Sequence, residues 1–287
     1  MTFEVGIIKY LETELEKDKD LKPISKPLFE QIVSTILTRY SQEVLKFKKE
    51  LIENPNKKIT KHPTFIILIK ELKKELGLLY SCYLLENPTK RERIINACSY
   101  EDTEELLALH KSTKERIPYY TEIYSKIFSW YKPKRILDLG CGYNPLSYAL
   151  ITKSLKSSPE YVAVDINAKD MELLSIFAKR NSLPLQSYCF STLDPKLFTT
   201  ILDKKEDCIF LFKALDSLEK IEPNATKTIF ERITAKHIVV SFPTKSLSSQ
   251  RNFSAQRNWF IGFLEKNNYQ FEIFDIENEK FFLITKN

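Results

Sequence analysis

The stretch RILDLGCGYNPL, residues 135–146, decides the fold class of this chain. A strand-like run of isoleucine and leucine leads directly into two closely spaced glycines, a pattern typical of a ligand-binding turn at the carboxyl end of a strand. A dinucleotide fingerprint would have its third glycine where Pro145 stands. Asn144 suits a helix cap and Pro145 a first helical position, so a side chain would fill part of the space that a pyrophosphate needs. The turn therefore favours a ligand without phosphate.

Short β-branched runs alternate with helical stretches after this turn, and this alternation predicts a parallel sheet with crossover helices. The runs are RILDL, YVAVD, LQSYCF, CIFLF and HIVVSF. Two further runs, FEIFDI and KFFLIT, lie so close together that only an antiparallel hairpin can join them. We therefore expect an α/β, Rossmann-like fold with a seven-stranded, mostly parallel sheet that ends in an antiparallel hairpin. This strand pattern is typical of class I methyltransferases that use S-adenosylmethionine (SAM).

The first part of the chain has a different pattern. Apolar residues recur three and four positions apart in FEQIVSTILTRYSQEVLKFKKELIE and in FIILIKELKKELGLLYSCYLLEN, which indicates amphipathic helices. The proline-bearing stretches ENPNKK, KHPT and ENPTKRER separate them. We predict an all-helical accessory domain over residues 1–105 and a methyltransferase domain over residues 106–287.

Charge and composition narrow the class of protein. The net charge is +6, and residues 39–93 contain 13 basic and 7 acidic side chains, which suits either a polyanionic partner or a solvated lysine surface. No apolar run is long enough to span a bilayer and the first residues do not resemble a secretion signal, so we expect a cytoplasmic protein without membrane contact. Five cysteines and three histidines lack ligand spacing, which predicts reduced, buried thiols and no metal site.

The DLGCG turn resembles motif I of SAM-dependent methyltransferases. Gly140 and Gly142 carry no Cβ, so a ligand can approach the backbone there. Asp165 ends the next strand, where a carboxylate accepts hydrogen bonds from ribose hydroxyls. Asp138, just before the glycines, is expected to order the turn or to meet the methionine amino group.

Four motifs, in this order, carry a narrower resemblance: HKSTKERIPYYTEIYSKIF from His110, DLGCGYNPL, LFKALDSLE and VSFPTKSL. Over residues 105–287 the chain resembles the aminoglycoside-resistance methyltransferases that modify N7 of guanine-1405 in 16S ribosomal RNA. The resemblance implies that Arg116 holds the SAM carboxylate, Gly140 the methionine portion and Asp165 the ribose, and that Thr113 supports the same pocket. It also implies S-adenosylhomocysteine as the product and the helical domain as an RNA-docking extension.

Two stretches depart from the family pattern. SYCFSTLD has no acidic residue directly at the strand end to receive the adenine amine, so Ser191, Thr192 or a backbone carbonyl is expected there. The glycine-rich loop of the family is replaced by SSQRNFSAQ, which leaves its substrate contacts open.

The expected reaction requires the protein mainly to position the methyl donor and the target base. Guanine N7 carries a lone pair and no proton, so its methylation needs no general base. Lys213, at the end of the fourth strand, is expected to meet the target base or a phosphate, although a structural salt bridge is also open, and Lys245 is expected to meet the RNA backbone. The predicted RNA contacts are Lys57, Lys58, Lys61, Lys90, Arg91, Arg93, Lys245, Arg251 and Arg257.

The leading hypothesis is thus a SAM-dependent methyltransferase, monomeric by expectation, that acts on 16S rRNA within the 30S subunit and confers aminoglycoside resistance. One alternative keeps the fold and changes the target to another rRNA base or a tRNA. Another is a non-catalytic RNA-binding or assembly factor that uses a SAM-type fold as a scaffold. A small-molecule methyltransferase would leave the basic helical domain unexplained.

Overall fold

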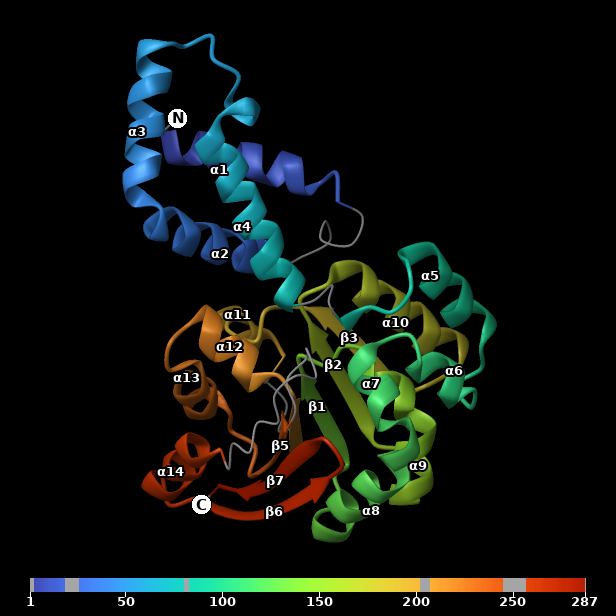
Figure 1. Cartoon of the computed structure of the whole chain (residues 1–287). Coiled ribbons are helices and arrows are strands. Elements are labelled where there is room, and N and C mark those ends of the chain that lie inside the picture. Colours follow the sequence, from blue (N-terminus) through green and yellow to red (C-terminus); the bar gives the residue numbers. More distant parts are fainter. Residues whose placement is uncertain (1–2, 19–25, 80–82, 202–206, 245–256, 287) are drawn as a thin grey trace. The chain divides into compact units, whose positions relative to one another are not determined.

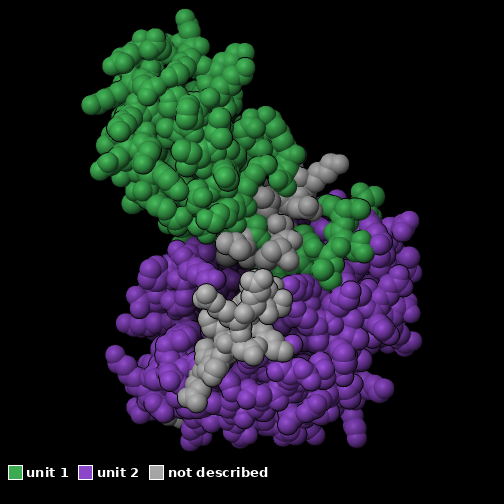
Figure 2. All heavy atoms as spheres, viewed as in Figure 1, with its two compact units in different colours: residues 1–89 green, residues 90–287 purple. Residues whose placement is uncertain are grey.

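The computed structural model describes residues 3–18, 26–79, 83–201, 207–244 and 257–286. The chain forms two compact units, residues 1–89 and 90–287 (Figure 2). The predicted boundary lay at residue 105. The helices after residue 90 instead belong to the second unit because Ile95, Leu106 and Leu107 are part of its core.

The first unit is helical. It comprises α1 (Phe3–Leu15), α2 (Lys26–Arg39), α3 (Ser41–Glu53), a short 3-10 helix (Ile59–Lys61) and α4 (Pro63–Leu79). Apolar positions predicted from the sequence period lie in its core, among them Val33, Phe47, Leu68 and Leu72.

One buried histidine orders the connection between α3 and α4. The His62 ring stacks on Phe47 at 4.1 Å between ring centroids, and its Nδ1 accepts a hydrogen bond from the Thr64 amide at 3.2 Å. Its Nε2 lies 3.1 Å from the Glu50 carboxylate. The basic connection of residues 54–62 is thus anchored at its carboxyl end.

The second unit is built on one seven-stranded sheet (Figure 1). Its strands are β1 (Arg135–Leu139), β2 (Glu160–Asp165), β3 (Leu185–Cys189), β4 (Cys208–Phe212), β5 (His237–Pro243), β6 (Gln270–Ile276) and β7 (Glu279–Thr285). The strand order is β3-β2-β1-β4-β5-β7-β6, and β7 runs antiparallel to both of its neighbours. The predicted parallel sheet with a terminal antiparallel hairpin is confirmed.

Helices cover both faces of this sheet (Figure 1). On one side lie α5 (Pro88–Ala97), α6 (Thr103–Leu107), α7 (Lys111–Arg116), α8 (Tyr120–Trp130), α9 (Tyr148–Leu155) and α10 (Ala168–Arg180). On the other lie α11 (Pro195–Thr200), α12 (Leu215–Ile221), α13 (Ala225–Arg232) and α14 (Asn258–Lys266). Strand β1 supplies both cores because its side chains alternate: Ile136 lies in the first core, and Leu137 and Leu139 in the second.

The topology brings several chain segments to one edge. Strands β1, β2, β4 and β5 are parallel, so they end at the same side of the sheet. Strand β7 enters from that side, and its first residue, Glu279, pairs with Pro243. The start of the hairpin therefore lies beside the ends of the parallel strands.

Candidate functional site

The glycine turn after β1 has the backbone that only glycine adopts readily. Gly140 has φ +68° and Gly142 has φ +49°, both in the left-handed region. The amide of Gly142 donates a hydrogen bond to the Asp165 carboxylate at 2.8 Å, so the turn is fixed to the end of β2. A Cβ on Gly140 would lie 3.2 Å from the Ala214 Cβ. The turn is thus closely packed on the side toward β4.

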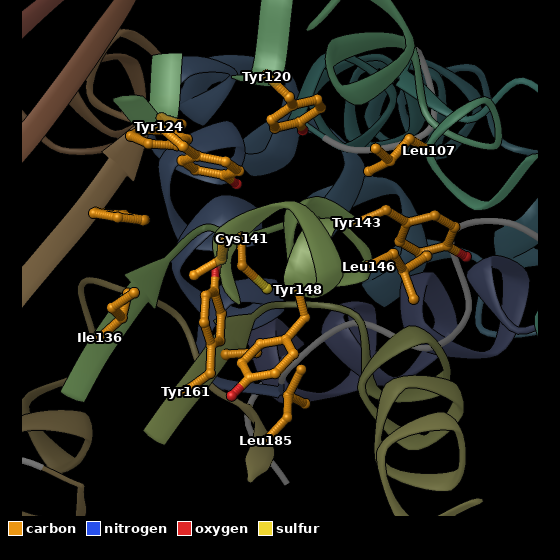
Figure 3. Close-up of a cluster of buried hydrophobic side chains, with 14 of the residues drawn as sticks. Leu107, Tyr120, Tyr124, Ile136, Cys141, Tyr143, Leu146, Tyr148, Tyr161 and Leu185 are labelled. Carbon is orange, nitrogen blue, oxygen red and sulfur yellow. The ribbon is translucent and has the colours of Figure 1, made fainter. Parts of the chain in front are cut away.

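Asp138 lies beneath this turn and is fully buried. Its Oδ2 accepts hydrogen bonds from the Tyr161 hydroxyl at 2.5 Å and from the Asn144 side-chain amide at 2.9 Å. Tyr120 in turn donates to the Asn144 side-chain oxygen at 3.0 Å. Tyr161 rises from β2 with its hydroxyl group directed toward the turn, while Tyr120 and Tyr124 approach from the other side (Figure 3).

The second oxygen of Asp138 has no such partners. Oδ1 is buried, and no donor among the described residues lies within hydrogen-bond distance. Burial raises the pKa of this carboxyl to about 6, against the effect of its hydrogen bonds from Tyr161 and Asn144. A buried acceptor without a donor is rare in folded proteins, and here it fits an amino group supplied by a ligand.

A buried ion network lies at the start of β7. Glu279 accepts hydrogen bonds from Arg116 Nε at 2.8 Å and Arg116 Nη2 at 2.7 Å, and Lys213 Nζ lies 3.3 Å from its second oxygen. The Ser241 hydroxyl also donates to this carboxylate. Burial opposes ionisation of Glu279, but the charges of Arg116 and Lys213 outweigh it and lower the pKa of the carboxyl.

Lys213 itself has an unusual backbone. It follows β4 with φ +55°, and its amide donates to the Ser241 backbone oxygen at 3.0 Å. A non-glycine residue in the left-handed region is uncommon and often lies at a functional site. Its ammonium group also contacts Glu115 at 3.0 Å, so two carboxylates hold the Lys213 side chain at this edge.

A cavity of about 230 Å³ adjoins this network. The ion-network residues Arg116, Lys213 and Glu279 line it, together with Glu115 from α7 and Tyr119. The cavity thus places a polar, charged lining beside the cation that is expected to meet the target base.

His110 closes the other side of the glycine turn. Its ring atoms lie 3.3 Å from the place where a Cβ on Gly142 would stand. Burial and the positive charges of Arg116, Arg91 and Lys213 lower the pKa of His110 to about 3, so the ring is neutral at physiological pH. Ser112 Oγ lies 2.9 Å from its Nδ1.

Together these residues fit the SAM contacts that the sequence resemblance implies. Arg116 offers a buried guanidinium for a carboxylate, Asp138 Oδ1 an acceptor for an amino group and Asp165 a half-buried carboxylate for ribose hydroxyls. The family model of the FmrO ribosomal RNA methyltransferases matches residues 96–281 of this sequence. The chain belongs to this family.

Two curated relatives of this methyltransferase share one functional name. A 16S rRNA (guanine(1405)-N(7))-methyltransferase from Serratia marcescens is 30% identical over 214 residues, which cover 72% of this chain and 79% of the relative. The enzyme of the same name from Micromonospora rosea is 30% identical over 184 residues, and the match spans 64% of its length.

Solved structures of 16S rRNA methylases share the fold. RmtF, in complex with S-adenosylhomocysteine, superposes with a TM-score of 0.74 at 17% identity and covers 100% of both chains. RmtB gives a TM-score of 0.72 at 23% identity and covers 98% of each chain. ArmA, at 25% identity, gives 0.56 over 71% of this chain.

Three residues differ from their predicted roles. Arg91, expected at an RNA surface, is buried and donates to the Tyr143 hydroxyl at 3.1 Å. Arg257 forms an ion pair with Asp216 and donates to the Pro243 backbone oxygen at 2.8 Å, so its guanidinium is engaged within the methyltransferase unit. Asn144 does not cap a helix with its side chain, because its side-chain oxygen accepts from the Tyr120 hydroxyl and its side-chain nitrogen donates to Asp138.

The remaining predicted cofactor residues have mainly structural contacts. The Thr113 hydroxyl donates to the backbone oxygens of Leu107 at 2.6 Å and His110 at 2.9 Å, which fixes the entry to α7. Ser191 and Thr192 are buried after β3. No adenine contact follows from these positions, so their cofactor role stays a prediction.

The predicted RNA residues fall in three groups. Lys58, Lys61 and Arg93 are exposed, whereas Lys57 is exposed but paired with Glu50 at 2.6 Å. Lys90 is half-buried at the start of α5. Lys245 and Arg251 lie outside the described residues.

The described part of the chain holds no group of three His, Cys, Asp or Glu residues arranged for a metal ion. Its cysteines 98, 141, 189 and 208 are free thiols, and Cys82 is not among the described residues. None of the described helices combines the length and the apolar character needed to cross a membrane.

Sequence reasoning missed Glu279. The stretch ENEK reads as hairpin turn residues, and nothing in its spacing indicates a buried carboxylate. The available signal was the pairing of the two last strands. Once β7 is antiparallel to β5, its first residue must lie at the edge where the parallel strands end.

Proposed function

We propose that this rRNA methyltransferase transfers the methyl group of SAM to N7 of a guanine of the 1405 type in 16S rRNA, acting as a monomer on the 30S subunit in the cytoplasm. The names of the S. marcescens and M. rosea relatives support the target. The observation that carries the proposal is the carboxylate of Glu279, which contacts at once Arg116 and Lys213, the residues that we expect to meet the cofactor and the target base.

The donor pocket has a distinct task for each side chain. SAM, when bound, supplies an electrophilic methyl group on a positively charged sulfonium. Arg116 would attract the carboxylate of the methionine portion, Asp138 Oδ1 its amino group and Asp165 the ribose. His110, uncharged because burial lowers its pKa to about 3, adds no positive charge beside a cationic donor.

The acceptor side requires orientation and no proton transfer. N7 of guanine attacks through an in-plane lone pair, so a fixed approach at roughly 3–3.5 Å supplies the catalysis. Lys213 is the residue we expect to orient the base, because its ammonium lies at the edge of the cavity and its backbone is held by Ser241. A guanine within a folded rRNA must leave its stack to reach this point.

Mass-spectrometric mapping of 16S rRNA after reaction of the full chain with purified 30S subunits and labelled SAM tests this function. The expected result is one new 7-methylguanine, at position 1405. Label on another base, on tRNA or only on free nucleosides would contradict it. Cells that express the chain are expected to show a raised inhibitory concentration for aminoglycosides, lost in the Lys213→Ala variant.

A further inference from the structure

Arg91 is a buried cation with no role in the function derived so far. It lies on α5, outside the strands and turns that form the predicted cofactor site, and is 3% exposed. Its Nε donates to the Tyr143 hydroxyl at 3.1 Å, and Nη2 lies 3.8 Å from Asp170 Oδ1. Tyr143 donates to the same Asp170 oxygen at 2.9 Å. Arg91, Tyr143 and Asp170 thus form a closed, buried triad.

Tyr143 directly follows the second glycine of the cofactor turn. Hydrogen bonds therefore hold the turn at three successive residues. The Gly142 backbone amide donates to Asp165, the Tyr143 hydroxyl to Asp170 and the Asn144 side-chain amide to Asp138. The first and third anchors lie within the sheet. The second connects the turn to α10 and α5, and the Tyr143 side chain is directed away from Tyr161 (Figure 3).

We propose that Arg91 is a positioning residue for the methyl donor, which sets the glycine turn through Tyr143. This inference rests on the use of SAM stated above. Without Arg91, the Tyr143 hydroxyl loses the hydrogen bond from Arg91 Nε, and the buried Asp170 carboxylate loses its ion pair with the Arg91 guanidinium. Burial and the negative charge of Asp170 both raise the pKa of Asp165, so the charge balance around Asp170 also reaches the residue expected to hold the ribose.

Hydrogen bonds from α10 fix the position of α5, the helix that carries Arg91. Arg180 of α10 donates to the backbone oxygens of Ile95, Asn96 and Cys98 at the carboxyl end of α5. The Tyr100 amide donates to the Asn181 side chain at 3.1 Å. Because α10 holds this end of α5, the Arg91 side chain is held in place for its hydrogen bond with Tyr143.

The test compares Arg91→Gln, Arg91→Lys, Tyr143→Phe and the Arg91→Gln/Tyr143→Phe double variant of the full chain, with the dissociation constant for SAM measured by calorimetry. Arg91→Gln and Tyr143→Phe are each expected to raise it about tenfold. The dissociation constant of the double variant is expected to be no higher than that of the more affected single variant, because both changes break the same contact between Arg91 and Tyr143. Arg91→Lys, which keeps the charge, restores part of the affinity.

Steady-state kinetics on 30S subunits separate positioning from general structural damage. Arg91→Gln is expected to raise KM for SAM about tenfold and to leave kcat at saturating SAM within twofold of the parent value. Glu92→Gln is the matched control and leaves both constants unchanged, because the side chain of Glu92 is 46% exposed and pairs with the exposed Lys169 at 3.5 Å.

Affinity within twofold of the parent in folded Arg91→Gln, or multiplied effects in the double variant, would overturn the inference. If Arg91→Gln does not fold, the Tyr143→Phe variant provides the test. An unchanged dissociation constant for SAM in that variant would reject the inference. Failure of the parent protein to bind SAM would instead reject the proposed function.

Discussion

Asp138 shows how one buried carboxyl links stability to cofactor binding. Its charged form is disfavoured by burial, and one oxygen lacks a donor among the described residues. Because the folded pKa, about 6, exceeds the ordinary value of 3.8, this group contributes stability below pH 4 and loses it as the pH rises through 6. The free protein therefore holds an unfavourable charge at neutral pH that a bound amino group would offset.

Asp138→Asn removes this charge and keeps an oxygen for Tyr161 and Asn144. We expect the variant to be more stable than the parent at pH 8, by about 3 kcal/mol, with the advantage vanishing near pH 4. SAM affinity is expected to fall at least tenfold. Urea unfolding at pH 4 and pH 8 measures the first effect and calorimetry the second. A variant that is less stable at pH 8 and binds SAM normally would contradict this account.

Loss of the Glu279 carboxylate removes the bidentate partner of the buried Arg116 guanidinium and one of the two carboxylates that contact Lys213. Glu279→Gln is expected to lower the free energy of unfolding by about 3 kcal/mol, because the Arg116 guanidinium stays buried beside a neutral amide. Since the neighbouring cations lower the pKa of Glu279, the difference from the parent is present above pH 4.5 and shrinks as the pH falls through the lowered pKa.

The matched control is Glu115→Gln, which removes the other carboxylate on Lys213. Glu115 is 45% exposed, so this change is expected to cost at most about 1 kcal/mol. Chemical denaturation of both variants at pH 7 compares the two carboxylates directly. Equal losses in the two variants would argue against a special role of the buried network.

Individual residues of the site were predictable only where a motif fixes them. Gly140, Gly142 and Asp165 follow from the strand-turn pattern, and the structure brings them together through the hydrogen bond between the Gly142 amide and Asp165. Arg91 was misread as a surface residue because the run KRER looks solvated in sequence. Its burial depends on Tyr143 and Asp170, which lie 52 and 79 positions away and reach it only through the fold.

At the scale of elements, the glycine turn carries the sharpest steric requirement. Gly140→Ala puts a Cβ on a residue with φ +68° and within 3.2 Å of the Ala214 Cβ. We expect a loss of stability of about 2 kcal/mol and a marked loss of SAM binding, because the turn cannot keep its shape.

Gly262→Ala in α14 serves as the control, since its added Cβ meets nothing within 4 Å. Alanine is expected to stabilise this helix by about 0.5–1 kcal/mol and to leave SAM binding unchanged. Thermal unfolding of both variants gives the sign of each effect. A stabilised Gly140→Ala variant would show that the turn is not constrained as described.

Strands were the most predictable elements because their local pattern and their burial agree. CIFLF is apolar throughout and RILDL and HIVVSF are mostly apolar, as expected of strands covered on both faces, and each forms a strand of the sheet. The helix cap at Asn144 was not predictable in the same way. An asparagine there suits a cap in isolation, but the Tyr120 hydroxyl takes its side-chain oxygen and the buried Asp138 takes its side-chain nitrogen.

At the scale of the whole molecule, the helical unit is the expected RNA-docking part. Lys58 and Lys61 lie on the connection that His62 anchors, and both are exposed. Exchange of both for alanine is expected to weaken 30S binding and to reduce the slope of log affinity against log salt by about 1.5, without an effect on SAM affinity.

Lys57→Ala is the matched control within the same connection, since Lys57 is already paired with Glu50. Its effect on the salt slope is expected to be smaller than that of either neighbour. Filter binding of 30S subunits at several salt concentrations gives the slopes. An unchanged slope in the Lys58/Lys61 double variant would remove this connection from the RNA interface.

The division of the chain into two units was predictable in kind but not in position. The change from helical periodicity to alternating strands marks the second unit, yet α5 and α6 are helical in sequence and belong to that unit. Local periodicity reports the type of an element, whereas the core to which it contributes depends on contacts far along the chain.

The central claim is that the edge formed by Asp138, Asp165 and Arg116 holds the methyl donor. A crystal structure of the full chain with S-adenosylhomocysteine tests it most directly. The account predicts the ligand amino group on Asp138 Oδ1, its ribose on Asp165 and its carboxylate on the Arg116 guanidinium, with Glu279 still in place. A ligand bound elsewhere, with Asp138 Oδ1 still lacking a donor, would contradict it.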